Sequence, residues 1–143
     1  MARALLISVV ALLLMTGCEN AESLRIEETR TKLVGTWLRE DSSEGGKTRR
    51  VLSLGADGKF VDRILITSED GRSERREFAG EWSFDGKNLK RRFLQENGRQ
   101  YSGGGMRYAT FALVSIGSSE FVVNDNIVGR EASYRKTAEG TQP

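Results

Sequence analysis

The chain has 143 residues, no histidine and one cysteine, and its 22 lysine and arginine residues nearly balance its 20 acidic residues. The formal net charge of +2 gives no strong field for binding nucleic acid. Without imidazole, nucleophilic triads lack their usual base, and zinc or copper sites built on histidine are excluded. We therefore expect a protein that is not an enzyme, with no catalytic residue, metal, cofactor or nucleic-acid partner.

Residues 1–17 have the pattern of a bacterial signal peptide. Arg3 supplies a positive charge, an apolar run extends from Ala4 to Met15, and Cys18 follows two small residues. The apolar run is about a dozen residues long, whereas a membrane-spanning helix needs ~20. A buried thiol is the alternative for Cys18, but its position directly after the apolar segment favours a processing site.

The stretch Leu14-Met15-Thr16-Gly17-Cys18 resembles a bacterial lipobox, with Met15 where leucine is commonest. The resemblance implies cleavage before Cys18, which would then carry a diacylglyceryl thioether and an acylated amino group such as palmitate. Several acyl chains are needed for stable anchoring, because one chain holds only marginally. Glu19 follows the cysteine where an aspartate would imply retention at the inner membrane. The resemblance therefore implies an outer-membrane lipoprotein, on the periplasmic side or the cell surface.

Residues 18–32 are predicted to form a lipidated tether that contains one short amphipathic helix. Ser23 is the candidate N-cap, Glu27 lies in an early turn, and Lys32 lies near the end, which suits the helix dipole. A disordered spacer is the alternative, since this segment is mostly polar.

After residue 32 the chain consists of short apolar or alternating runs bounded by turn residues, which is typical of an all-β fold. Asp-Gly and Asn-Gly pairs supply the positive φ of tight hairpins. No connection is long enough for a crossover helix, so neighbouring runs should pair antiparallel. Closing the sheet removes its exposed edges, so we predict a small eight-stranded antiparallel up-and-down barrel over residues 33–137, followed by a disordered tail at 138–143. The eight runs are 33–40, 48–55, 59–67, 76–84, 88–96, 106–116, 120–124 and 127–136.

Alternation predicts which side chains face the barrel interior. The fourth run places Phe78, Gly80, Trp82 and Phe84 on one face. The third run, 59–67, does not alternate cleanly, and we predict a β-bulge within it.

Adjacent arginines in the fifth run must point to opposite faces, so either Arg91 or Arg92 should enter the barrel. An arginine in that position needs a buried partner or an anionic ligand.

The first run, Leu33-Val34-Gly35-Thr36-Trp37, after a charged helix and before seven further runs, resembles the lipocalin-like branch of the calycins. In that group the glycine and tryptophan close one barrel end, and a basic residue of the last strand lies across the indole. The resemblance implies these roles for Gly35, Trp37 and Arg135, with Arg130 as the poorer candidate for the cation.

Two functions fit these observations. In the first, a lipid-anchored envelope protein binds a small apolar or amphipathic ligand inside the barrel, and a cavity of ~300 Å³ or more would favour it. In the second, a filled barrel is a non-enzymatic interaction module, inhibitor-like or binding an anionic envelope component through surface arginines. The candidate cavity residues for the first function are Phe78, Gly80, Trp82, Phe84, Phe93 and Tyr108.

Overall fold

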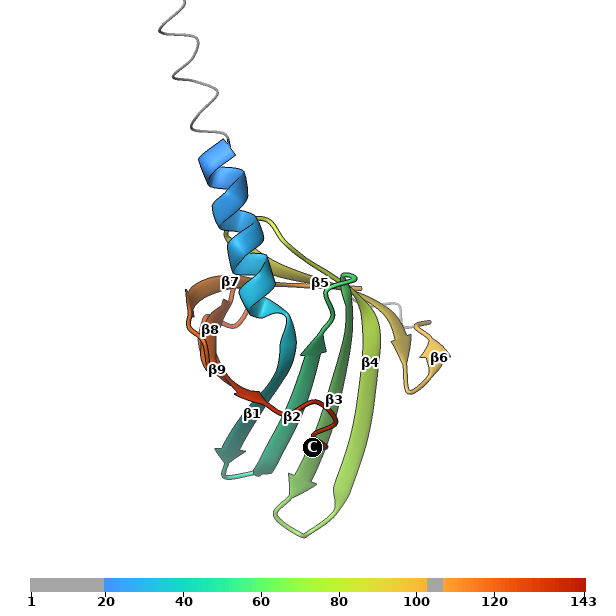
Figure 1. The fold of residues 1–143 in the computed structure, drawn as a ribbon. Helices are drawn as coiled ribbons and strands as arrows, with labels where there is room; N and C mark the ends of the chain where they lie inside the picture. The colour runs from blue at the N-terminus through green and yellow to red at the C-terminus, as the bar shows by residue number, and fades with distance from the viewer. Residues whose placement is uncertain (1–19, 103–106) are drawn as a thin grey trace, which may run out of the picture.

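The computed structural model describes residues 20–102 and 107–143. A helix (residues 20–33) leads into one antiparallel sheet that closes on itself (Figure 1). The predicted all-β barrel with a short N-terminal helix is confirmed. The strands are β1 (Gly35–Ser43), β2 (Gly46–Leu54), β3 (Lys59–Ser68), β4 (Ser73–Phe84), β5 (Asn88–Glu96), β6 (Arg99–Gln100), β7 (Tyr108–Ile116), β8 (Glu120–Asp125) and β9 (Arg130–Thr137).

The strands pair in chain order, except that β5 pairs with β7 across β6, and the ladder between the first and last strands closes the barrel. β1 pairs with β9, and β4 pairs with β5, so eight strands form an up-and-down barrel. β6 lies outside this ring because it pairs only with β5. It was not predicted, since a strand of two residues has no alternation to detect.

The predicted bulge in the third run is wrong. β3 keeps an uninterrupted register with both neighbours, and its inward face is Phe60, Asp62, Ile64 and Ile66. The alternation is hidden in the sequence because one inward residue, Asp62, is charged. The register shifts lie elsewhere, at Ala79/Gly80 in the β4–β5 ladder and at Leu113/Ser115 in the β7–β8 ladder.

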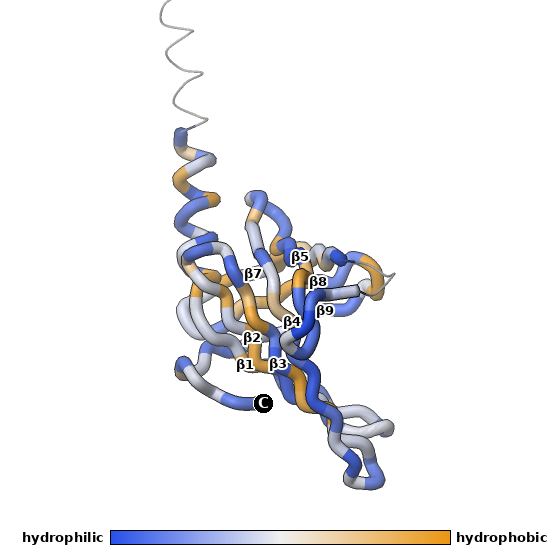
Figure 2. Tube along the Cα trace, turned by 90° about the vertical axis from the view of Figure 1, so that its right-hand side faces the viewer, coloured by the Kyte–Doolittle hydropathy of each residue, from blue (hydrophilic) through white to orange (hydrophobic). Residues whose placement is uncertain are grey.

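The core fills the half of the barrel next to the helix. Its largest side chains are almost fully buried, including Leu33, Trp37, Phe60 and Phe121, each at 2% exposure or less. The described residues contain no disulfide. Burial of apolar side chains is the main source of folding stability, so this cluster is what stabilises the barrel. Figure 2 shows the hydrophobic stretches gathered in the body of the barrel, between the helix and the hydrophilic hairpin ends.

The helix covers one barrel end. Trp37 Nε1 donates to the Leu33 carbonyl at 2.8 Å, and Arg30 Nη2 donates to the Ala56 carbonyl in the β2–β3 turn at 3.0 Å. The Arg30 guanidinium also lies 5.2 Å from the centre of the Trp82 ring, within cation–π range. Ser23 lies inside the helix, which already includes residue 20, so the predicted cap is misplaced. Of the segments in the described ranges, no helix is long and apolar enough to cross a membrane.

The C-terminal residues differ from the expected disordered tail. Thr141 donates to the Ala138 carbonyl in a turn, and Arg49 on β2 donates to the Gln142 carbonyl at 3.4 Å. Residues 138–143 therefore lie against the outside of the barrel.

Candidate functional site

The barrel end opposite the helix holds a cavity of about 500 Å³. The β1–β2 and β3–β4 hairpins extend at this end, which we call the mouth (Figure 1). Four basic residues and one acidic residue line the cavity, together with hydroxyl groups and glycines, but Lys47 has the outward position of its strand and contributes from the rim. The charged lining residues are Arg39, Arg50, Lys47, Arg130 and Asp41.

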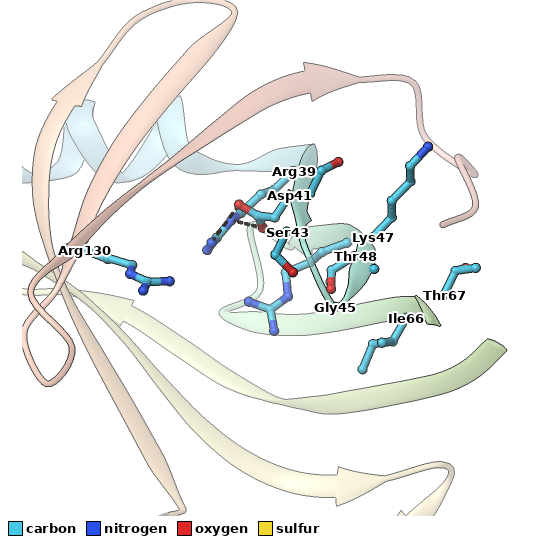
Figure 3. Close-up of a pocket in the computed structure, with 12 residues that line it drawn as sticks. Arg39, Asp41, Ser43, Gly45, Lys47, Thr48, Ile66, Thr67 and Arg130 are labelled. Atoms are coloured by element: carbon cyan, nitrogen blue, oxygen red, sulfur yellow. Dashed lines mark hydrogen bonds and ion pairs between the residues drawn. The ribbon is translucent and has the colours of Figure 1, made fainter. Parts of the chain in front are cut away.

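Strand alternation brings the charged side chains inside. Arg39 and Arg50 are cross-strand partners in the β1–β2 ladder, two residues beyond the Trp37–Leu52 pair of the core. Because alternate residues share a face, the same inward face that is apolar at Trp37 becomes polar at Arg39 and Asp41. Figure 3 shows Arg39 and Asp41 on one side of the pocket and Arg130, from β9, on the other.

An ionic cluster lies beneath the cavity. Arg91 Nη1 donates to Asp62 Oδ2 at 2.6 Å, and the two side chains are only 3% and 2% exposed. Arg50 Nε lies 3.2 Å from the other carboxylate oxygen of Asp62. One buried carboxylate thus serves two guanidinium groups, which leaves an excess positive charge in the cluster.

The sequence prediction that either Arg91 or Arg92 enters the barrel and needs a partner is confirmed. Arg91 is the inward residue, and its guanidinium lies over three core rings, Phe60, Phe93 and Phe111, at 5.1–5.6 Å from their centres. Arg92 is exposed on the outer face and contacts Glu81. Arg91 therefore marks the boundary between the aromatic core and the polar mouth.

Several polar atoms of the cluster are buried without a hydrogen-bond partner among the described residues. They are Arg39 Nε, Arg50 Nε, Arg91 Nε and Asp62 Oδ1. Arg39 Nε lies 2.6 Å from Asp41 Oδ2 but is not aligned with it, and the aligned bond runs from Arg39 Nη2 to Asp41 Oδ1 at 3.1 Å. Arg50 Nε and Asp62 Oδ1 face each other at 3.2 Å, so the cluster is held by ion pairs whose hydrogen bonds are poorly aligned.

The arginines at the mouth are held in the charged state. Burial disfavours the charge of Arg50, but Asp62 and Tyr134 outweigh it, so the Arg50 pKa lies above its ordinary value. Burial likewise opposes the charge of Arg39, and Asp41 with Tyr134 raises the Arg39 pKa. Both guanidiniums therefore remain donors at any physiological pH, and forked donors suit carboxylate and phosphate oxygens. Across residues 20–102 and 107–143, no three metal-binding side chains cluster closely enough to hold a metal ion.

The six predicted cavity residues do not enclose a common cavity. Trp82 is buried, and Phe78, Phe84 and Phe93 pack against the core cluster. Gly80 was expected to leave room, yet a Cβ there would lie 1.9 Å from the Arg92 carbonyl oxygen and 3.0 Å from Phe60 Cε1. The glycine permits close packing at the β4–β5 register shift instead. Tyr108 is 58% exposed, so it lies outside the barrel.

The predicted barrel-closing cation is also corrected. Lys136 Nζ lies 5.2 Å from the centre of the Trp37 ring, and Lys136 is the cross-strand partner of Trp37. Arg135 is one residue earlier, so it points outward and pairs with Glu40 at 3.0 Å. Arg130, the poorer candidate, lines the mouth. Gly35 precedes Trp37 with a φ of 142°, and a Cβ there would approach Lys136 Cε at 3.2 Å.

The predicted lipid-attachment residue, Cys18, lies outside the described residues.

Sequence reasoning missed Asp62 as the centre of the ionic cluster and Arg39 with Asp41 as mouth residues. The available signal was the alternation of the third run. Asp62 lies two residues after Phe60 and two before Ile64, so it faces inward with them. A charged residue at an inward position predicts a buried partner, and Arg91 was already expected to need one.

Comparison with known proteins gives one structural likeness. A lipocalin-like protein from Bacteroides uniformis, solved by crystallography, is similar over 74% of this chain and 99% of its own, with 21% sequence identity and a TM-score of 0.49. No protein-family model matches the chain, and no curated protein matches it.

Proposed function

We propose that the barrel binds a small ligand through an acidic group held in the mouth. The observation that carries this proposal is the composition of the 500 Å³ cavity, where the inward arginines Arg39, Arg50 and Arg130 outnumber the single acidic side chain, Asp41. Such an excess of positive charge in a recess attracts anions and is relieved when one binds. The guanidinium groups of Arg39 and Arg50 both line this cavity and supply the hydrogen-bond donors for that anion.

The filled aromatic half argues against a wholly apolar ligand. Trp37, Phe60 and Phe121 occupy the interior near the helix with almost no exposed surface, and Gly80 leaves no gap. The volume that would favour a ligand-binding barrel exists at the polar mouth instead. The ligand is therefore expected to be polar or amphipathic, with its acidic group at Arg50. The alternative, an interaction module with a filled barrel, predicts that any anion binds surface arginines and that none binds saturably in the mouth.

Isothermal titration calorimetry of the purified protein tests this proposal. Inorganic phosphate, citrate and an uncharged apolar dye serve as probes at low ionic strength, because salt screens exposed charges. We expect saturable binding of at least one anion. Arg50→Gln should weaken this binding about tenfold or more, because a hydrogen bond to a charged group contributes ~1.5–3 kcal/mol. Arg99→Gln, an exposed arginine on β6, is the matched control and should leave binding unchanged. Binding of the dye alone, or equal losses in both variants, would reject the proposal.

A lipid anchor at Cys18 is part of the proposed function, with outer-membrane attachment and the periplasmic side or cell surface as the location. The support is the lipobox-like stretch that ends at Cys18. The helix includes residue 20 and covers the barrel end opposite the mouth, so an anchored protein would present its mouth away from the membrane. This orientation suits a ligand taken from the aqueous phase.

Membrane fractionation tests the anchor. Wild-type protein should sediment with the outer membrane and incorporate labelled palmitate, whereas Cys18→Ser should leave an uncut or released form. Recovery of the wild type in the soluble fraction after osmotic shock would contradict the anchor and leave the binding proposal standing.

A further inference from the structure

The mouth has two walls that carry arginines. Arg39 and Arg50 lie on the β1–β2 wall, and Arg130 lies at the start of β9 on the other wall. Figure 3 shows the cavity between them.

Backbone pairing does not join the walls at this level. The β1–β9 ladder has only three residue pairs and stops at Leu38–Arg135. The β1–β2 ladder, by contrast, continues to Ser43, and the β8–β9 ladder continues to Arg130. Beyond Leu38 the barrel wall is therefore split between β1 and β9, a gap that we call the seam.

One side chain on the outer face bridges the upper edge of the seam. Glu40 pairs with Arg135 of β9 at 3.0 Å and with Arg49 of β2 at 2.6 Å. All three groups are substantially exposed, so these contacts contribute little stability. On the inner face, the Arg39 guanidinium lies 5.9 Å from the centre of the Tyr134 ring of β9. Arg130, nearer the mouth, forms no ion pair within the described part of the chain.

The inner arginines differ in how far their charge is already compensated. Asp41 faces Arg39 with both carboxylate oxygens, at 2.6 and 3.1 Å. Arg50 shares Asp62 with Arg91, and its contact of 3.2 Å lacks hydrogen-bond alignment. Arg50 and Arg130, one on each wall, are therefore the two guanidiniums with the greatest capacity for a new anionic partner.

We infer that the ligand carries two separated acidic groups, one bound by Arg50 and the other by Arg130, so that it bridges the seam. This inference rests on the proposed function and specifies its ligand class. A dicarboxylate-type anion offers one acidic group to each wall, whereas a monocarboxylate has a single group for both. Its binding would replace the missing β1–β9 ladder with a ligand-mediated contact.

Calorimetry with a series of anions tests the inference. The probes are butyrate as the monoanion, succinate, glutarate and adipate as dianions of increasing length, and inorganic phosphate as a compact anion of similar charge. We expect one dicarboxylate to bind at least tenfold tighter than both butyrate and phosphate. Arg130→Gln should weaken that dicarboxylate about tenfold and change butyrate binding less than twofold, while Arg99→Gln should alter neither.

Two results would overturn the inference while leaving the proposed function intact. One is phosphate or butyrate binding as tightly as every dicarboxylate, which would indicate a single-group site. The other is an equal loss of mono- and dicarboxylate affinity in Arg130→Gln. Failure of all five anions to bind would reject the proposed function together with the bridging ligand. Amide hydrogen exchange provides a second readout, since the bridging dicarboxylate should slow exchange in residues 39–43 and butyrate should not.

Discussion

Asp62 on β3 and Arg91 on β5 form a hydrogen-bonded ion pair of 2.6 Å inside the barrel, where both side chains are at most 3% exposed. The pair separates the aromatic core from the basic mouth. A buried pair adds little net stability because desolvation offsets its attraction, but loss of one partner leaves an uncompensated buried charge. The pair thus constrains both the fold and the charge of the mouth.

Asp62→Asn should lower the free energy of unfolding by ~3–5 kcal/mol, because Arg91 would stay buried without its counter-ion. Urea denaturation measures this loss. The matched control is Glu77→Gln, which breaks the Arg63–Glu77 pair of 2.8 Å on the outer face. Its side chains are 36% and 44% exposed, so the expected loss is less than about 1 kcal/mol. Equal losses in the two variants would contradict the buried role of Asp62.

The architecture could be predicted from the sequence because its signals are local. Turn residues such as Asp85-Gly86 separate the runs, and the β4 alternation from Phe78 to Phe84 identifies an inward face. The mouth could not be predicted in the same way. Its charges come from strands far apart in the chain, and their meeting depends on register, which the turns fix only once the barrel closes.

Single-residue offsets limited the predicted sites. The basic residue over Trp37 was expected at Arg135, and the ladder places Lys136 there. Neighbouring residues of a strand point to opposite faces, so an error of one residue is enough to name the wrong side chain. The last-strand motif therefore predicted the correct strand and the wrong residue. The prediction that Gly80 leaves room for a ligand failed for another reason. A glycine leaves space only where no neighbouring backbone fills it, and here the Arg92 backbone does.

Trp37 and Lys136 should show energetic coupling. Trp37→Ala should destabilise the protein by ~3–5 kcal/mol as a large core truncation. A double-mutant cycle should give ~0.5–1 kcal/mol of coupling between Trp37 and Lys136, because the ammonium lies over the indole. The same cycle with Arg135→Ala should give almost none. Stronger coupling to Arg135 than to Lys136 would contradict the observed register.

Gly80→Ala should destabilise the barrel by about 1–3 kcal/mol or more, because the new Cβ would collide with the Arg92 carbonyl oxygen at 1.9 Å. Thermal unfolding measures the effect. Gly45→Ala is the control, since a Cβ there meets only Ser43 Oγ at 3.9 Å. A Gly80→Ala protein as stable as this control would show that β4 and β5 do not approach so closely.

Asp85 should make the β4–β5 turn sensitive to acid. A hydrogen bond from Lys90 and others from the Asn88 and Lys87 amides hold the Asp85 pKa well below its ordinary value of about 3.9. A lowered carboxylate pKa stabilises the fold above the unfolded-state pKa, and this contribution is lost as pH falls through the folded-state value. Asp85→Ala should therefore be less stable than wild type at pH 7, with a difference that shrinks progressively below about pH 4. A difference that stays constant from pH 7 to pH 2 would exclude this role for the ionised carboxylate.

The central claim is that an anion binds at the mouth arginines, and NMR of the arginine Nε–H groups tests it most directly. In a titration of the purified protein with succinate, the Arg50 and Arg130 Nε signals should shift saturably, because both guanidiniums line the cavity. The signals of exposed Arg92 and Arg99 serve as internal controls and should stay in place. Saturable shifts confined to the mouth arginines are the predicted result. No shift at any anion concentration, or equal unsaturated shifts at all four arginines, would contradict the claim.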